Sequence, residues 1–253
     1  MAKTKVDYRK AERAYRGLWG IFIGLIVIVL AMICFFYVFL VRTIRIVGNE
    51  RYTSEEVIQM SGLPYEESMF LIDKEQIRNN LETSPYLEVK EITRIWPFTV
   101  RITVHERVAV AYTEYGDNRL VLDEKGYILT KDGIYYQDTL VKVTGWKISE
   151  ANIGEKIVTE EPSIANSYAT IMMKLGEYEL LDRVEGLDIR DLLNIELTMQ
   201  DGMRVKLGDS TSVDDKMTWL SQMLIELEKE GYSGGVLDLS SGNTAVYRPE
   251  QGK

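Results

Sequence analysis

The hydrophobic pattern is dominated by one long apolar run near the start of the chain. Residues 17–41 contain no Asp, Glu, Lys, Arg or His. A helix rises about 1.5 Å per residue, so this run crosses a hydrocarbon core of about 30 Å with some tilt. A signal peptide has a shorter apolar region and a small-residue cleavage site, whereas this run ends in the bulky sequence FFYVFLVR. The pattern therefore predicts a retained transmembrane helix over residues 17–41.

The next part of the chain, residues 42–112, alternates between strand and helix periodicity. A strand is predicted over residues 43–47, and the turn sequence Gly48-Asn49 follows it. Thr53 and Glu56 have the spacing of a capping box, which indicates the start of a helix. This part of the chain therefore opens with a strand, a turn and a capped helix.

A second helix and two strands are predicted to complete this part. The helix is expected over residues 73–85, between an N-cap aspartate and a proline. Strands are expected over residues 87–95 and 100–104, and Trp96-Pro97-Phe98 bends the chain between them. We expect Trp96 to pack on the domain's own core, with a partner anchor as the alternative. The order strand, helix, helix, strand, strand predicts a small α+β domain with both helices on one face of a sheet.

Residues 113–249 show short strands, turns and two further helical patterns. An Asp201-Gly202 turn marks the clearest hairpin. We expect Trp219 to lie on the apolar side of the second of these helices, in the core. The predicted elements are a hairpin over 120–129, a strand over 139–146, a helix over 163–181, a hairpin over 195–207, a helix over 212–232 and two closing strands within 235–248. This predicts a distal mixed β domain with two helices, followed by a short disordered tail over residues 250–253.

The charge distribution predicts the orientation in the membrane. Residues 1–16 carry six basic and two acidic side chains, and the rest of the chain carries 24 basic and 37 acidic ones. The positive-inside rule then keeps the tail of residues 1–16 in the cytoplasm and exports everything after the span. The acidic balance of the exported part argues against nucleic acid as a partner and favours proteins. Cys34 is the only cysteine and lies in the span, so no disulfide is expected in the exported part.

Few residues have the character of a catalytic site. The single histidine, His105, falls in a predicted strand without a cysteine or second histidine to share a site, so we expect it on or near the surface. Asp214-Asp215 are expected to favour a helix start rather than bind a metal. Gly231–Gly235 lack the Lys-Ser/Thr of a phosphate loop. We predict no catalytic residues, cofactor, metal or small-molecule substrate, although a serine–lysine pair stays open.

Several stretches resemble one protein family. IRIVGNERYTSEEV and SPYLEVKEITRIWPFTVRITVHER resemble a POTRA (polypeptide-transport-associated) domain. They are followed by VLDEKGYIL, GLDIRDLLNIELTMQDGMRVKLG, KMTWLSQML and GGVLDLSSGNTAVYRP. In this order the stretches resemble the FtsQ/DivIB family of bacterial cell-division proteins, from about residue 18 to residue 249. The lack of exported cysteine, the acidic exported half and the short C-terminal tail resemble Gram-positive DivIB more closely.

The last strand is where we expect a partner to bind. A strand at the end of a chain often lies at a sheet edge, where a partner strand can add to it. The alternative is a plain closing strand of a hairpin. In the family, the corresponding region docks a protein resembling FtsB, or DivIC in Gram-positive bacteria. The resemblance therefore implies a binding site made of Val236, Leu237, Leu239, Thr244, Ala245, Val246 and Tyr247.

The resemblance implies a non-enzymatic scaffold of the bacterial divisome. It would be a single-pass protein of the plasma membrane, concentrated at the division septum. It would bind DivIC/FtsB-like and FtsL-like partners outside the membrane and so assemble and regulate septal wall synthesis. One alternative is a POTRA-containing transport or chaperone module, but those proteins carry a β-barrel of at least about eight strands, for which residues after 112 lack the pattern. Another alternative, a membrane-anchored hydrolase, lacks a triad in the sequence.

Overall fold

The computed structural model describes residues 4–131 and 140–249, with side chains described from Leu18 onwards except at Phe36. The chain divides into two compact units. The first unit consists of Met1–Leu81 and Val89–His105, and the second consists of Glu82–Glu88 and Glu106–Lys253. Their helices and sheets confirm the predicted α+β class, with one apolar N-terminal helix, a β-α-α-β-β domain and a distal β domain with two helices. The tail expected to be disordered, residues 250–253, lies outside the described residues.

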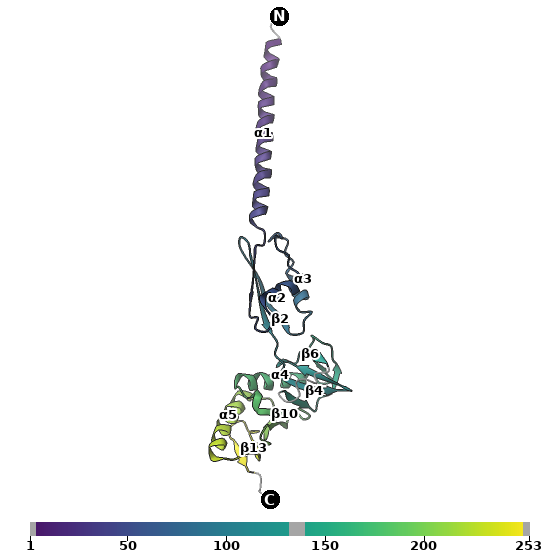
Figure 1. Ribbon diagram of the computed structural model, residues 1–253, viewed down its shortest axis with the longest axis vertical. Coiled ribbons are helices and arrows are strands. Elements are labelled where there is room, and N and C mark those ends of the chain that lie inside the picture. Colours follow the sequence, from purple (N-terminus) through teal and green to yellow (C-terminus); the bar gives the residue numbers. More distant parts are fainter. Residues whose placement is uncertain (1–3, 132–139, 250–253) are drawn as a thin grey trace. The chain divides into compact units, whose positions relative to one another are not determined.

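The N-terminal helix α1 spans Thr4–Val38 (Figure 1). Its segment Leu18–Phe35 is long and apolar enough to cross a membrane, and none of it is buried against the protein. The helix ends three residues before the predicted end of the span at Val41. Val41 is fully buried, and its N–H donates to the Glu67 carbonyl at 2.8 Å. Val41 therefore belongs to the domain that follows and not to the helix.

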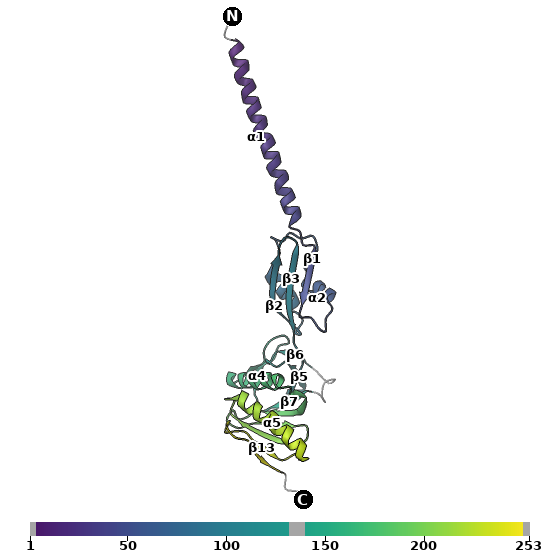
Figure 2. The same cartoon turned by 90° about the vertical axis from the view of Figure 1, so that its left-hand side faces the viewer.

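The first unit contains a three-stranded sheet with two helices (Figure 2). Its strands are β1 (Thr43–Val47), β2 (Leu87–Ile95) and β3 (Thr99–Glu106), in the order β1-β3-β2 with β1 parallel to β3. The helices are α2 (Ser54–Ser61) and α3 (Lys74–Leu81). Alternate residues of β3 are buried, as are the apolar positions of both helices, so one face of the sheet packs on the helices.

The predicted start signals of both helices are confirmed. The Thr53 hydroxyl accepts from the Glu56 N–H while the Glu56 carboxylate accepts from the Thr53 N–H, which completes a capping box. Asp73 accepts two backbone N–H bonds at the start of α3. Helix α3 ends at Leu81, earlier than the predicted stop at Pro85.

Trp96 does not lie in the core, so that prediction is wrong. It lies in the turn between β2 and β3, and 51% of its surface is exposed. Its ring packs on Phe39 and Phe70, with centroids 5.3 and 5.2 Å away. The two strands that flank Trp96 bury their own apolar residues, and the turn leaves Trp96 outside that core.

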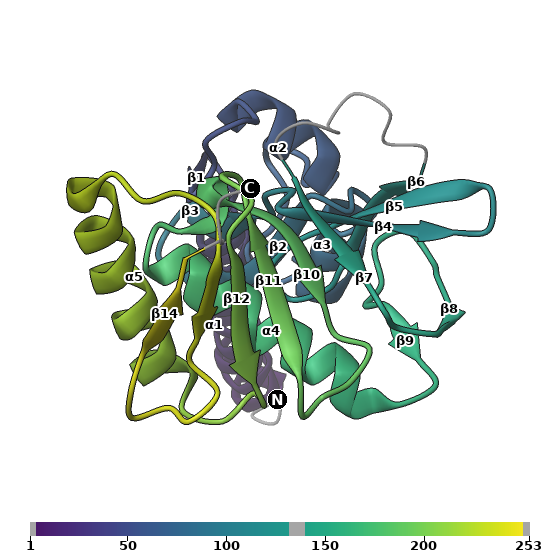
Figure 3. The ribbon, with the colours of Figure 1, turned by 90° about the horizontal axis from the view of Figure 1, so that it is seen from below.

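The second unit is built on a long mixed sheet (Figure 3). Its order over the described residues is β14-β13-β12-β11-β10-β7-β4-β5-β6. The strands are β4 (Ala111–Tyr115), β5 (Asn118–Leu122), β6 (Ile128–Lys131), β7 (Val141–Thr144), β10 (Val184–Asp188), β11 (Ile195–Met199), β12 (Arg204–Gly208), β13 (Val236–Asp238) and β14 (Val246–Arg248). A separate small sheet pairs β8 (Ile148–Glu150) with β9 (Val158–Thr159). The sheet thus ends at β14 on one side and at β6 on the other.

Two long helices supply the other half of this core. They are α4 (Pro162–Glu177) and α5 (Val213–Glu230), and a short 3-10 helix, η2 (Leu181–Arg183), follows α4. Tyr168 of α4 and Leu220 of α5 are fully buried with strand residues such as Leu197. Ser212 precedes α5, as predicted, but its side chain makes no capping bond because its backbone is left-handed, with φ 50°. The helix ends at Glu230, two residues before the predicted end, and its C-cap residue Gly231 adopts φ 75°.

Candidate partner-binding edge

The predicted docking strand, β14, is the terminal strand of the long sheet. It pairs antiparallel with β13 on one side, with Tyr247 opposite Leu237 and Val246 opposite Asp238. The strand order ends there, so β14 is an edge strand among the described residues. A turn stabilised by the bond from the Gly242 N–H to the Leu239 carbonyl (3.0 Å) returns the chain from β13 towards it. The fold therefore places the last strand where another polypeptide could add to the sheet.

The two faces of β14 differ. Tyr247 is half-buried and packs against the core. Its hydroxyl donates to the Gly234 carbonyl at 3.0 Å, and its ring centroid lies 5.8 Å from that of Tyr232. Val246, the preceding residue, points to the opposite face and is 47% exposed. One face of the strand thus holds it to the domain and the other is open to solvent.

The seven residues implied by the resemblance fall into two groups. Leu237 and Leu239 are buried in the core, so their side chains support the edge from within. The other five lie at the surface or partly so. Thr244 and Val246 are exposed, and Val236, Ala245 and Tyr247 are half-buried. The structure brings all seven into two neighbouring strands and their connecting loop, but only the second group presents side chains to a partner.

The charge of Asp238, on the strand next to β14, is stabilised by hydrogen bonds within a local turn. The Asp238 carboxylate accepts from the Ser240 N–H at 3.1 Å and from the Ser240 hydroxyl at 2.7 Å. These bonds hold the pKa of Asp238 below its ordinary value, and Lys206 and Arg248 add to the effect. A carboxylate therefore lies opposite Val246, and a guanidinium follows Tyr247.

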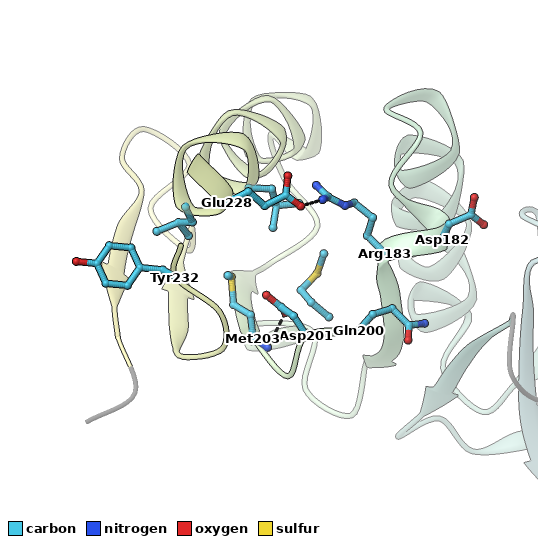
Figure 4. A pocket seen from close by; sticks show the side chains of 10 residues that line it. Asp182, Arg183, Gln200, Asp201, Met203, Glu228 and Tyr232 are labelled. Carbon is cyan, nitrogen blue, oxygen red and sulfur yellow. Dashed lines mark hydrogen bonds and ion pairs between the residues drawn. The ribbon is translucent and has the colours of Figure 1, made fainter. Parts of the chain in front are cut away.

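A hollow lies between the end of α5 and the β11–β12 hairpin (Figure 4). It has a volume of about 230 Å³. Arg183 and Glu228 form an ion pair at one side of it, and Met203 and Tyr232 line the other. Tyr232 was not among the predicted residues. Its position directly after Gly231, which ends the helix, could have identified it in the sequence, because an aromatic side chain there can pack against the last strand, as the ring of Tyr232 does against Tyr247.

A second, open groove flanks the loop that leads into β14. It has a volume of about 390 Å³ and is lined by Trp219 of α5 and by the turn residues Gly242 and Asn243, among others. Trp219 is 36% exposed, so the prediction that it lies in the core is wrong. Its neighbours Met217 and Leu220 occupy the core instead. The groove and the hollow leave apolar side chains accessible near both ends of α5.

The described residues do not assemble a catalytic constellation. Among them, no group of three or more His, Cys, Asp or Glu side chains could hold a metal ion. His105 is exposed on β3 in the first unit. Asp214, in the first turn of α5, pairs with Lys174 at 2.8 Å and holds the pKa of that lysine well above its ordinary value together with Glu177. The β14 edge, the hollow and the groove form a surface on which a polypeptide could lie.

Comparisons with known proteins agree with this architecture. Residues 39–107 match the model of the FtsQ-type POTRA domain, and residues 109–240 match that of the FtsQ/DivIB C-terminal domain of cell-division proteins. Cell division protein DivIB of Clostridium tetani is 26% identical over 88% of this chain and 85% of its own. DivIB of Clostridium botulinum strain Hall is 24% identical over 96% of this chain and 94% of its own. One solved structure that matches is the major extracytoplasmic domain of DivIB from Geobacillus stearothermophilus, in its trans isomer. The match has 16% sequence identity and a TM-score of 0.31, and it covers 45% of this chain and 87% of the solved chain.

The two matched segments are one residue apart and leave out residues 1–38, which contain α1, and residues 241–253, which contain β14. The C-terminal match alone covers more than half of the chain. Relatives that match over most of the chain include DivIB proteins of Clostridia, as the acidic balance and the lack of cysteine after the span suggested. The chain belongs to the FtsQ/DivIB family of bacterial cell-division proteins.

Proposed function

We propose that this protein is a non-enzymatic bitopic scaffold of the bacterial divisome. The basic tail of residues 1–16 lies in the cytoplasm, α1 crosses the plasma membrane, and both following domains lie outside it at the septum. There the protein binds DivIC/FtsB-like and FtsL-like partners, and so assembles and regulates septal wall synthesis. Family membership and the single apolar helix support this proposal. The FtsQ type of the POTRA match favours division over transport.

The observation that carries the proposal is the position of β14 at the end of the long sheet. An edge strand offers backbone N–H and C=O groups to another strand, and natural edges are often blunted by Lys or Pro. Here Thr244–Tyr247 contain neither, and the first cationic residue and the first proline that follow are Arg248 and Pro249. A partner strand beside β14 would gain affinity from backbone bonds and specificity from side-chain pockets. The groove near Trp219, which the turn residues Gly242 and Asn243 also line, is the candidate for such a pocket.

The substitution Val246→Lys tests this edge. Val246 is 47% exposed, so a lysine there leaves the core intact while it places a charge at the proposed junction. We expect affinity for the DivIC-like partner from the same organism to fall about tenfold or more, which corresponds to about 1.4 kcal/mol. Binding is measured by biolayer interferometry with the full chain in nanodiscs. Tyr247→Lys is a second variant, and we expect it to reduce binding further because Tyr247 also holds the strand through Tyr232 and Gly234.

Val158→Lys is the matched control. Val158 is 45% exposed on β9, in the separate two-stranded sheet. It therefore introduces the same charge at an equally exposed valine away from β14. The edge-strand model would be contradicted if Val246→Lys and Val158→Lys both left the affinity unchanged, or if both reduced it equally.

A further inference from the structure

The first unit carries a group of large apolar side chains on its surface. Tyr65, Phe70 and Leu71 lie in the loop between α2 and α3, and Trp96 and Phe98 lie in the turn between β2 and β3. Each of the five is at least 40% exposed, and Leu71 is 72% exposed. We call these five residues the aromatic patch. An exposed apolar cluster of this kind marks a surface for a partner protein or for a membrane.

Backbone hydrogen bonds fasten both loops of the patch to the segment that leaves α1. The Met69 N–H donates to the Phe39 carbonyl at 2.8 Å, and the Glu66 N–H donates to the Val41 carbonyl at 2.9 Å. The Arg42 N–H donates to the Phe98 carbonyl at 2.9 Å, which ties in the second loop. The patch is therefore held close to the C-terminal end of α1, which is the helix that fits a membrane span.

Ring contacts place the patch at the depth of the end of the span. Phe35 lies towards the C-terminal end of the apolar run of residues 17–41, and the segment Leu18–Phe35 alone, at about 1.5 Å per residue, covers about 27 Å of a core of about 30 Å. Phe70 stacks on Phe35 with centroids 5.8 Å apart, and Trp96 lies 5.2 Å from Phe70. A bilayer that surrounds Phe35 therefore also surrounds Phe70.

We propose that the aromatic patch lies in the membrane interface, in the leaflet at the C-terminal end of α1, where headgroups meet acyl chains. The occupant of this surface is lipid and not a protein, because ring contacts run from Phe35 and Phe39 to Phe70 and Trp96, so that these two residues of the patch continue the lipid-facing surface of α1. Trp and Tyr favour this interface because their rings have an apolar body and a polar edge. The first unit then has two attachments to the bilayer, the span and the patch, which limit its tilting about the short linker after α1.

Spin labels test the depth of the patch. The only cysteine, Cys34, is first replaced by serine, and then Leu71→Cys or Tyr65→Cys is introduced in the full chain and labelled. The protein is reconstituted alone in phosphatidylcholine nanodiscs. We expect relaxation of the Leu71 label by a water-soluble nickel chelate to be on the order of fivefold weaker than at an exposed site, because apolar surroundings exclude the chelate. Oxygen, which concentrates in lipid, is expected to relax that label more strongly.

Leu193→Cys in the same background is the matched control. Leu193 is a leucine of equal exposure, 73%, in the second unit. Equal nickel accessibility at residues 71 and 193 would overturn the proposal, since a patch that serves a protein partner would face water in this sample. The proposal rests on α1 crossing the bilayer but not on partner binding. If the labels show that the patch faces water, the prediction for Val246→Lys still stands. If Val246→Lys leaves partner binding unchanged, the proposed position of the patch in the membrane still stands.

Discussion

Lys216 is buried in the first turn of α5, close to the end of β12. Its ammonium donates to the Asp209 carbonyl oxygen at 2.8 Å and to the Asp209 carboxylate at 2.9 Å. The lysine and the bonds from Thr211 lower the pKa of Asp209 from 3.8 to about 2. This pair joins the sheet to the helix that carries Trp219 on its exposed side.

Asp209→Asn is expected to destabilise the second unit by about 1–2 kcal/mol at neutral pH. The buried ammonium loses its carboxylate but keeps the carbonyl, and solvent access to residue 209 reduces the cost. Because the folded pKa of Asp209 lies below its ordinary 3.8, its contribution is present above about pH 4 and is lost as the pH falls towards 2. Urea unfolding of wild type and variant across this range measures the difference, which should close at low pH.

The double variant Asp209→Asn/Lys216→Met is the control for that experiment. Replacing a buried charge by an apolar side chain of similar length removes the need for a counter-ion. We expect the double variant to recover most of the lost stability at neutral pH. If it is no more stable than Asp209→Asn, the buried ammonium is not the cause of the loss.

Single-residue burial was only partly predictable from the sequence. The alternation of Val100, Ile102 and Val104 identified a buried face directly, and all three are in the core. Trp96 and Trp219 were misassigned because their exposure depends on where a turn and a helix meet other parts of the chain, which periodicity does not encode. Leu237 was predicted to bind a partner but lies in the core, since a strand beside an edge still buries one face.

Among the elements, the turn after β1 is tightly constrained at Gly48. Gly48 adopts φ 88°, a left-handed conformation, and a Cβ there would collide with the Val104 carbonyl oxygen on β3. Gly116, in the turn between β4 and β5, also has a positive φ, of 60°, but a Cβ there would meet nothing. The two glycines therefore share a left-handed backbone conformation, but only Gly48 lacks room for a Cβ atom.

Gly48→Ala is expected to destabilise the first unit by about 2–5 kcal/mol, the sum of the left-handed cost and of overpacking against β3. Gly116→Ala should cost only the left-handed term, about 1–2 kcal/mol. Hydrogen exchange of amides in β1 and β3 measures the first effect within its own unit. Equal protection of these strands in wild type and Gly48→Ala would show that β1 can shift to relieve the contact.

Elements with local signals were predictable, and elements defined by long-range pairing were not. The Asp201-Gly202 hairpin and the Thr53 capping box follow from residues two or three apart. The strand β10 was missed because it pairs in parallel with β7 and lacks a turn signal of its own. The edge position of β14 depends on the complete strand order.

At the scale of the whole molecule, α1 contributes length and apolarity, while the proposed recognition surfaces lie in the domains after it. No residue of Leu18–Phe35 is buried within the described structure, so the sequence of the span is little constrained by packing. Confinement to a membrane raises the effective concentration of two proteins anchored in it without any added contact. We therefore expect that another apolar sequence can replace the membrane-spanning part of α1, provided that Phe35 is kept and still stacks on Phe70.

Replacement of residues 18–34 by an unrelated apolar sequence of equal length is expected to preserve localisation at midcell. The proposed determinants of recruitment, β14 and the groove near Trp219, are unchanged by the swap. Fluorescent fusions of the wild type, the helix swap and Val246→Lys, expressed at equal levels in the source bacterium, measure this. The first two should form a midcell band, and Val246→Lys should spread along the membrane. A helix-swap variant that stays in the membrane but is lost from midcell would show that α1 itself recognises a partner. The β14 edge would then not be sufficient for recruitment to midcell.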